Sequence, residues 1–193
     1  MSRGKTRAIW MLTGNPHKYE EGRLTLSEMG IDLHLLRGEK LEIQADELEE
    51  IASHSLEGIS INDPRLIISE ESGLFIERYG GFPGPYSSYT LRKIGLIGIL
   101  KLMEGLEDRR AYYKSVIALK HGCDLHLFQG VVWGRISQEP RGTGGFGYDP
   151  IFIPDEGDGR TFGEMTIEEK NAISHRARAF RMLGAWLKSN PRI

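Results

Sequence analysis

Apolar residues alternate with polar ones, or run together, in five segments whose lengths fit β-strands. These segments cover residues 7–12, 32–36, 66–69, 109–122 and 124–137. The last two are rich in β-branched and aromatic residues and flank a turn near Gly122, which predicts an antiparallel hairpin. After residue 69, the pattern EESGLFIE predicts a glycine turn followed by a second short strand.

Four other segments are predicted to be helices. They cover residues 16–29, 46–57, 91–103 and 166–187. Asn15 suits the cap of the first helix and Pro16 its first turn, while Thr166 and Glu169 form a capping box at the start of the last. Strands and helices thus share the chain, and we find no internal repeat or low-complexity segment.

A helical wheel of residues 166–187 separates a polar stripe from an apolar one. The polar stripe holds Lys170, Asn171, Ser174, His175 and Arg178, and the apolar stripe holds Ile173, Ala177, Phe180, Leu183 and Leu187. Arg176 falls near the apolar side. Because a buried guanidinium needs a partner, this position is hard to explain as ordinary solvated surface.

Composition narrows the class of protein. The 193 residues, 39% of them hydrophobic, suffice for one folding unit over 1–193, and the net charge of −2 disfavours a stable nucleic-acid partner. The single Cys123 excludes internal disulfides and multi-cysteine metal cages. The longest apolar run, 94–102, is too short to span a bilayer, so we expect no membrane partner and a cytoplasmic location.

The stretch from Gly142 to Arg176 is the strongest candidate for ligand binding. Glycines at 142, 144, 145 and 147 allow the backbone to approach a ligand closely, and Phe146 and Tyr148 place aromatic rings among them. Cationic side chains follow at 170, 175 and 176. Aromatic faces beside cations suit a planar base joined to phosphates, which predicts a nucleotide.

Two further segments favour phosphate and metal chemistry. TGNPHK at 13–18 ends a strand and opens a helix, a place where backbone N–H groups often bind phosphate, although it also reads as a simple cap. Glu70 and Glu71 are adjacent in a predicted strand end, so at most one of them faces a given site. With no zinc-like histidine spacing and no GxSxG segment, carboxylates and phosphate turns favour Mg²⁺-assisted chemistry on a phosphate ester.

Five motifs together resemble the Ham1-like inosine/xanthosine triphosphate pyrophosphatases. They are TGNPHK at 13–18, EESGL at 70–74, GGFPGPYSSY at 80–89, GFGYDPIF at 145–152 and EEKNAISHR at 168–176. The resemblance implies an α/β fold with a long central mixed sheet, flanking helices and a cleft between two lobes. It also implies a homodimer, Mg²⁺ dependence, and cleavage of deaminated purine nucleoside triphosphates (ITP, dITP, XTP) to monophosphate and pyrophosphate.

Carried over by position, the resemblance implies a role for each motif residue. The turn that would hold the triphosphate comprises Thr13, Gly14, Asn15, Pro16, His17 and Lys18. Glu42 and Glu71 would bind metal, with Glu71 also activating water and Ser72 touching substrate. The base would meet Phe146, Gly147, Tyr148 and Asp149, with Lys170 on a phosphate or the ribose and with His175 and Arg176 at the 6-oxo edge.

The chain departs from the family pattern at two places. Glu71 stands where the family usually has aspartate, and the extra methylene moves the carboxylate by somewhat more than about 1 Å, which matters for a positioned group. Ser53, His54 and Ser55 stand where the family often has a phosphate-binding lysine.

Three other functions remain open from the sequence. They are a phosphohydrolase that releases the γ-phosphate, a nucleotide-binding or regulatory module with little turnover, and an RNA-binding protein that uses Phe146 and Tyr148 for stacking. The net charge of −2 weakens the case for an RNA-binding protein. The replacement of the family's aspartate by Glu71 keeps the regulatory module open.

Overall fold

The computed structural model describes residues 7–38, 40–41, 43–60 and 62–191. A seven-stranded mixed sheet runs through the molecule in the order β2-β1-β3-β5-β6-β7, with the short β4 paired to β3. The strands are β1 Arg7–Leu12, β2 Ile31–Leu36, β3 Ile67–Ile76, β4 Pro83–Gly84, β5 Arg110–His121, β6 Asp124–Ile136 and β7 Phe152–Pro154. β1 pairs in parallel with β2 and β3, and the remaining pairs are antiparallel.

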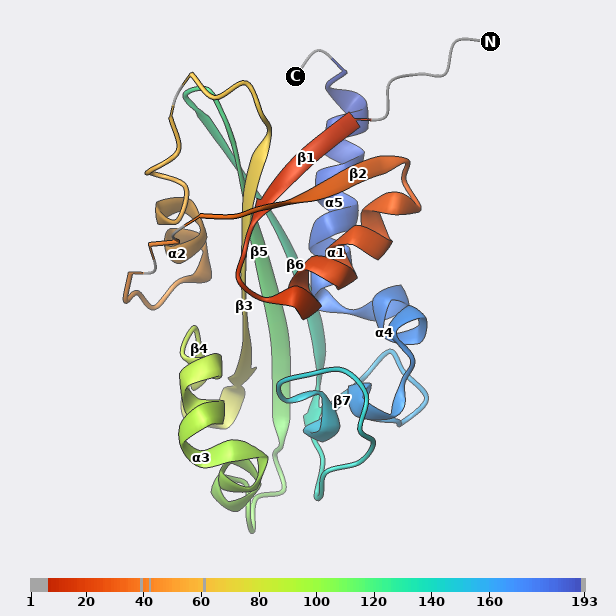
Figure 1. Cartoon of the computed structure of the whole chain (residues 1–193). Helices are drawn as coiled ribbons and strands as arrows, with labels where there is room; N and C mark the ends of the chain where they lie inside the picture. The colour runs from red at the N-terminus through yellow and green to blue at the C-terminus, as the bar shows by residue number, and fades with distance from the viewer. Residues whose placement is uncertain (1–6, 39, 42, 61, 192–193) are drawn as a thin grey trace.

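Three long strands, β3, β5 and β6, extend through both halves of the molecule and join them (Figure 1). The upper lobe in this view contains β1, β2 and the helices α1 Pro16–Ser27, α2 Leu48–His54 and α5 His175–Ser189. The lower lobe contains β4, β7 and α3 Ser87–Leu102, while α4 Ile167–Ile173 lies close to the junction. The mixed α/β fold with two lobes expected from the motifs is therefore confirmed.

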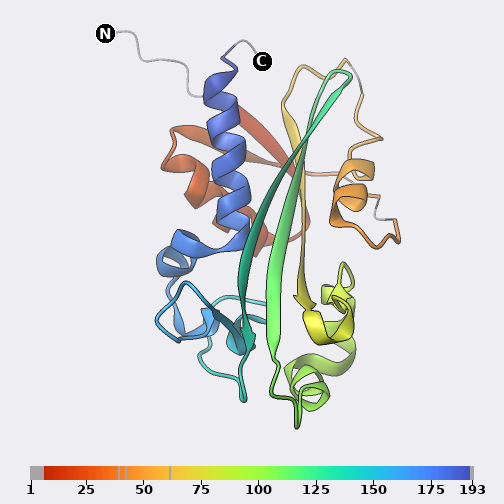
Figure 2. The same cartoon turned by 180° about the vertical axis from the view of Figure 1, so that it is seen from behind.

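Each lobe has its own apolar packing against the sheet. In the upper lobe, Leu26 of α1 and Phe180 of α5 pack over one face, and Leu48 of α2 packs with Leu12 and Ile67 on the other. α5 and α2 accordingly lie on opposite sides of the long strands when the molecule is seen from behind (Figure 2). A separate cluster around Phe152, Phe162 and Ile99 fills the lower lobe. The sheet is therefore the element that both lobes share.

Residues 67–76 form one continuous strand, so the predicted glycine turn after EES is wrong. Gly73 pairs with Lys114 of β5 inside the ladder. A Cβ at this position would lie 2.2 Å from the carbonyl oxygen of Gly84, which is in β4. Glycine is needed at this position because β4 approaches closely. A glycine inside a strand and a glycine in a turn look the same in the sequence, which explains the wrong prediction.

The last predicted helix is in fact two helices, because Ser174 is extended at φ −69° and ψ 154°. Its hydroxyl oxygen accepts a hydrogen bond from the Ala177 N–H and caps α5. The wheel drawn across this break is therefore wrong: Lys170, Asn171 and His175 are buried rather than on one polar stripe. The Thr166 capping box is confirmed.

Most other predicted elements are confirmed within a few residues. The hairpin turns at Gly122, and the Asn15 side chain caps α1. α3 begins at Ser87, four residues before its predicted start, and is kinked at Gly95, whose φ is +65°. Within the part of the chain described, no helix is long and apolar enough to cross a membrane.

Candidate active site

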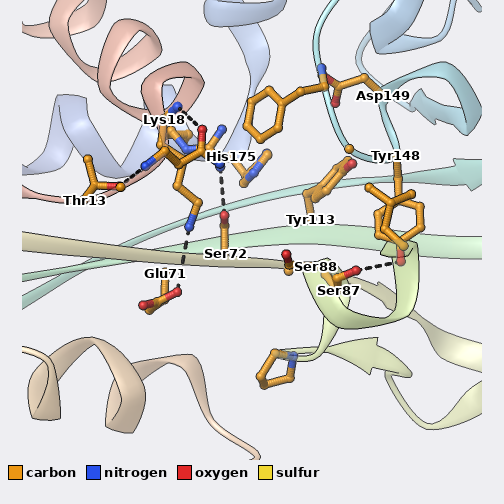
Figure 3. Close-up of a pocket in the computed structure, with 18 of the residues that line it drawn as sticks. Thr13, Lys18, Glu71, Ser72, Ser87, Ser88, Tyr113, Tyr148, Asp149 and His175 are labelled. Atoms are coloured by element: carbon orange, nitrogen blue, oxygen red, sulfur yellow. Dashed lines mark hydrogen bonds and ion pairs between the residues drawn. The ribbon is translucent and has the colours of Figure 1, made fainter. Parts of the chain in front are cut away.

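A cavity of about 460 Å³ lies between the lobes. The sequence-predicted residues that line it are Thr13, Gly14, Asn15, Lys18, Glu71, Ser72, Phe146, Gly147, Tyr148, Asp149, Lys170, His175 and Arg176. All five motifs thus meet at one place, because the loop GGFPGPYSSY adds Pro85, Ser87 and Ser88. Ser87 and Ser88 lie at the start of α3 (Figure 3). Pro16 and His17 do not line this cavity, although His17 lines a smaller neighbouring pocket with Phe146 and Lys170. Glu42 lies outside the described residues.

The turn between β1 and α1 is held by its own side chains. The Asn15 Oδ1 accepts from the N–H groups of His17 at 2.9 Å and Lys18 at 3.2 Å. The Asn15 N–H in turn donates to the Thr13 hydroxyl at 3.1 Å. Since Asn15 already uses two of the N–H groups expected to bind phosphate, the ammonium of Lys18 is the main positive group that this turn presents to the cavity.

Glu70 and Glu71 point to different environments, as the alternation of a strand requires. Glu70 is fully buried and accepts from the Ser115 hydroxyl at 2.7 Å and from the Arg176 Nε at 3.1 Å, and Lys18 Nζ is 3.1 Å from its other oxygen. Burial alone would raise the pKa of Glu70, but the attraction of Arg176 and Lys18 outweighs it and holds this pKa well below its ordinary value. Glu70 is therefore a fixed structural anion.

Glu71 is mostly buried and lines the cavity. One carboxylate oxygen pairs with the Lys40 ammonium, and the other lies 3.8 Å from Lys18 Nζ. No group of three or more His, Cys, Asp or Glu side chains that could hold a metal occurs among the described residues. A cavity-facing carboxylate fits a site where Mg²⁺ takes one or two protein oxygens and completes its shell from substrate phosphates, and the ammonium groups beside it suit those phosphates.

The glycine loop folds back on the carboxylate of Asp149. Asp149 Oδ2 accepts from the Phe146 N–H at 2.8 Å and from Lys170 Nζ at 2.6 Å. Gly145 has φ +67°, and a Cβ there would lie 2.1 Å from the same oxygen. Burial raises the pKa of Asp149, while Lys170 opposes that shift. The glycine is needed for closure of the loop on itself.

The ring of Phe146 contacts one aromatic ring and two cations. The His17 ring stacks on it with centroids 5.0 Å apart, while Lys170 Nζ and the Arg176 guanidinium carbon lie 4.8 and 5.2 Å from its centroid. Tyr148, in contrast, belongs to the lower-lobe core, and its hydroxyl donates to the Ser87 carbonyl at 2.8 Å. Phe146 is therefore the aromatic side chain best placed for stacking, and Tyr148 secures the start of α3.

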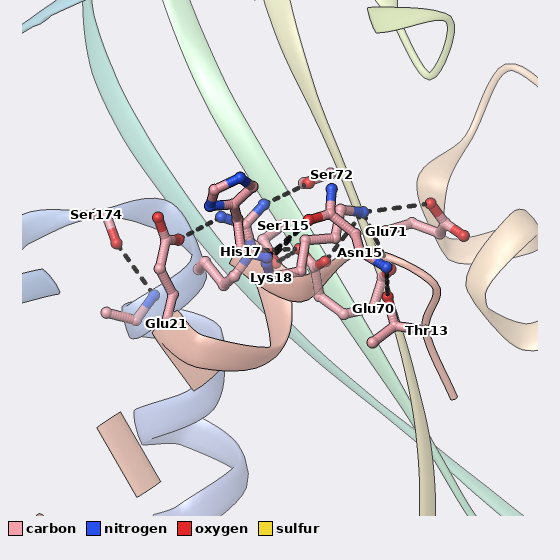
Figure 4. A network of polar contacts seen from close by, with 12 residues as sticks. Thr13, Asn15, His17, Lys18, Glu21, Glu70, Glu71, Ser72, Ser115 and Ser174 are labelled. Carbon is pink, nitrogen blue, oxygen red and sulfur yellow. Dashed lines mark hydrogen bonds and ion pairs between the residues drawn. The ribbon is translucent and has the colours of Figure 1, made fainter. Parts of the chain in front are cut away.

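Arg176 lies in a buried network of ion pairs with Glu21 and Glu70. Figure 4 shows Glu21, Glu70 and Ser72 of this network. The Arg176 guanidinium donates to Glu21 at 2.5 Å, Glu70 at 3.1 Å and the Ser72 hydroxyl at 2.8 Å. Glu21, from α1, also accepts from Lys170 at 2.6 Å. The predicted partner of the inward arginine is thus confirmed. Glu21 was missed because an acidic residue on a helix usually marks solvated surface.

His175 stacks on Tyr113, with ring centroids 4.5 Å apart and planes 5° from parallel. It is 2% exposed, and neither ring nitrogen has a hydrogen-bond partner within the described structure. Burial, with Arg176 and Lys170 nearby, places the pKa of His175 well below 6.5. The ring is therefore neutral at pH 7 and offers one N–H donor and one acceptor to the cavity.

The sequence did not indicate every lining residue. Lys40, Gly73, Leu91 and Tyr113 also line the cavity. Tyr113 comes from a strand that looked purely structural, and no local signal marks it. Ser53, His54 and Ser55 of the second-helix region do not line the cavity, and the two serine hydroxyls donate to carbonyls within the helix region.

The two-lobed mixed sheet and the cavity lined by the five motifs are features of the Ham1-like proteins. The family model agrees, because residues 9–186 match the Ham1 family, and this chain therefore belongs to that family. A dITP/XTP pyrophosphatase of Pyrococcus horikoshii is 54% identical over 182 residues, covering 94% of this chain and 97% of that protein. One from Thermococcus kodakarensis is 50% identical over 179 residues, covering 93% and 96%.

Solved structures agree in fold. A HAM1 protein from Coxiella burnetii superposes with a TM-score of 0.82 at 29% identity, covering 95% of this chain and 99% of that one. The Ham1 protein of Staphylococcus aureus has a TM-score of 0.80 at 25% identity, covering 95% and 100%. The motifs identified in the sequence therefore belong to a fold shared over nearly the whole chain.

Proposed function

We propose that this protein hydrolyses deaminated purine nucleoside triphosphates, ITP, dITP and XTP, to the monophosphate and pyrophosphate. The observation that carries the proposal is one cavity with Lys18 and Glu71 at one part and Phe146, His175 and Arg176 at another. The first set suits phosphates and a metal, and the second suits a planar base with an acceptor edge. Relatives 54% and 50% identical that are named dITP/XTP pyrophosphatases support this substrate class.

Selection for the 6-oxo group follows from the hydrogen-bond donors at the base end. Neutral His175 offers one N–H, and Arg176 has five N–H groups, of which Glu21, Glu70 and Ser72 use three. A 6-oxo purine accepts from such donors, whereas the 6-amino group of adenine presents another donor. Each unpaired buried donor costs about 1–3 kcal/mol, or roughly tenfold to a hundredfold in discrimination.

Mg²⁺ is proposed as the cofactor, held by Glu71 together with substrate phosphate oxygens. Glu42 is a further proposed ligand. The metal would neutralise charge on the phosphates as a Lewis acid. Lys18 binds the triphosphate, and the Glu71 carboxylate orients the water that attacks the α-phosphorus. Ser72 follows Glu71 in β3 and accepts a hydrogen bond from Arg176. This hydrogen bond links the base end of the cavity to the strand that carries Glu71.

We further propose that the protein is a homodimer located in the cytoplasm. Exposed apolar side chains on and beside α3, among them Tyr89 at 55% and Ile97 at 56%, supply surface for a second copy. The exposed free thiol of Cys123 suits a reducing compartment. Light scattering of the purified protein at several concentrations tests the dimer.

A panel of nucleoside triphosphates assayed with Mg²⁺ tests the main proposal. We expect pyrophosphate and IMP from ITP, comparable release from dITP and XTP, and little from ATP. Orthophosphate with IDP would instead support cleavage at the γ-phosphate. Tight ITP binding with no IMP, even with Mn²⁺, would support a regulatory module.

A further inference from the structure

Lys40 is a cavity residue that neither the motifs nor the proposed mechanism uses. It follows β2, and its ammonium pairs with Glu71 Oε1 while Lys18 approaches Oε2 at 3.8 Å from α1. Lys40 and Glu71 are each 13% exposed, so this pair lies inside the cavity rather than on the outer surface. The carboxylate of Glu71 is thus held between ammonium groups from two separate elements.

The balance of charge around the cavity favours a polyanion. Among the described lining residues, Lys18, Lys40, Lys170 and Arg176 are cationic, whereas only Glu71 and Asp149 are carboxylates. Lys170 and Arg176 are committed to buried carboxylates, including Glu21, at 2.6 and 2.5 Å. Lys18 and Lys40 are the cations beside Glu71, although Lys18 also pairs with the buried Glu70 at 3.1 Å. Figure 3 shows Lys18 next to Glu71.

A metal ion and the Lys40 ammonium compete for the same carboxylate. A cation coordinated by Glu71 would lie beside the Lys40 ammonium on Oε1, and two cations on one carboxylate repel each other. This repulsion favours movement of Lys40 when a metal binds, and its flexible four-carbon stem permits that movement. The nearest new anion is the triphosphate that arrives with the metal.

We propose that Lys40 is a triphosphate-binding residue that holds Glu71 in the substrate-free protein and transfers to phosphate when metal and triphosphate bind. This inference rests on the proposed function, because it takes the end of the cavity lined by Lys18, Lys40 and Glu71 as the triphosphate site. It assigns a phosphate-binding cation to the segment between β2 and α2, while the second-helix region supplies none to the cavity. The longer side chain of Glu71, compared with aspartate, extends the carboxylate toward Lys40.

If Lys40 competes with the metal for Glu71, then removing its ammonium changes the affinities for triphosphate and for Mg²⁺ in opposite directions. A lysine with only a structural role would not produce this pair of changes. Without the Lys40 ammonium, triphosphate loses a charge-assisted contact and binds more weakly. Mg²⁺ alone, in contrast, loses a competitor for Glu71 and binds more tightly. Lys40→Ala, Lys40→Arg and the wild type are compared with Lys101→Ala, which removes an exposed lysine at the end of α3.

Calorimetry measures Kd for inorganic triphosphate without metal and, separately, for Mg²⁺ without phosphate. For Lys40→Ala we expect a Kd for triphosphate about tenfold higher and a Kd for Mg²⁺ severalfold lower. Lys40→Arg should retain triphosphate binding, and Lys101→Ala should match the wild type in both titrations. The proposal is overturned if Lys40→Ala binds triphosphate within about twofold of the wild type, or if it binds Mg²⁺ no more tightly.

These titrations separate failure of this inference from failure of the proposed function. Far-ultraviolet circular dichroism first establishes that each variant is folded. If the wild type releases pyrophosphate from ITP but the Kd values do not move, only the role of Lys40 is wrong. If the wild type releases none, the proposed function fails, and the two titrations still decide whether Lys40 binds triphosphate.

Discussion

The two ends of the cavity are built differently. At the base end, the side chains of Lys170 and Arg176 are 2% exposed and fixed by buried carboxylates. At the phosphate end, the side chain of Lys18 is 15% exposed and that of Glu71 13%, and Lys18 is shared between Glu70 at 3.1 Å and Glu71 at 3.8 Å. Recognition of the base thus relies on a preorganised network, whereas the end proposed for metal and phosphate retains charges that can exchange partners. Substitutions should therefore affect stability at the base end and turnover at the phosphate end.

Glu71→Gln should have the largest effect on catalysis. The amide keeps the shape of the side chain but removes the charge needed for metal binding and for orienting water, so kcat for ITP should fall about a thousandfold or more. Because Glu71 lies on the cavity wall and glutamine has the same shape, the melting temperature should stay close to that of the wild type. Steady-state kinetics and a thermal melt check both, and retained turnover would remove Glu71 from the proposed chemistry.

Glu21→Gln should be the most destabilising of these changes. It leaves the buried cations Lys170 and Arg176 without one shared carboxylate, which typically costs about 3–5 kcal/mol. Chemical denaturation measures the loss in the free energy of unfolding. The matched control is Glu20→Gln, because Glu20 forms an exposed pair with Arg23 and should change stability by less than about 1 kcal/mol. Equal effects of the two substitutions would show that the network contributes little.

His175→Phe tests the donor at the base end. Phenylalanine preserves the ring that stacks on Tyr113 but has no N–H group, so kcat/KM for ITP should fall about tenfold and the value for ATP should barely change. Parallel assays on the two nucleotides measure the ratio. A similar loss with both would mean that His175 supports the cavity shape without reading the base.

The buried His175 should also make stability depend on pH. Its pKa is lowered in the folded protein, so below about pH 6.5 the unfolded chain binds a proton that the folded chain does not. The wild type should lose up to about 1.4 kcal/mol per pH unit relative to His175→Phe as pH falls from 6.5 towards 5. Denaturation of both proteins at several pH values measures this difference, and parallel curves would contradict the buried neutral ring.

Most of the local structure follows from the sequence alone. The Asn15 cap, the Thr166 capping box and the hairpin at Gly122 depend on residues close together in the chain, and the structure confirms each. The motif pattern also identified most of the residues that line the cavity, as well as the need of Arg176 for buried partners.

Contacts between distant segments decided the rest. Gly73 is required because β4 packs against β3. Glu21 is buried because α1 meets α4 and α5. Lys40 pairs with Glu71 from the segment that follows β2. The break at Ser174 places Lys170 and His175 inside the protein, although a continuous wheel placed them on one polar stripe. Short-range patterns record backbone preference and capping, whereas the partner of a buried charge depends on tertiary packing, which brings residues more than 100 positions apart within hydrogen-bonding distance.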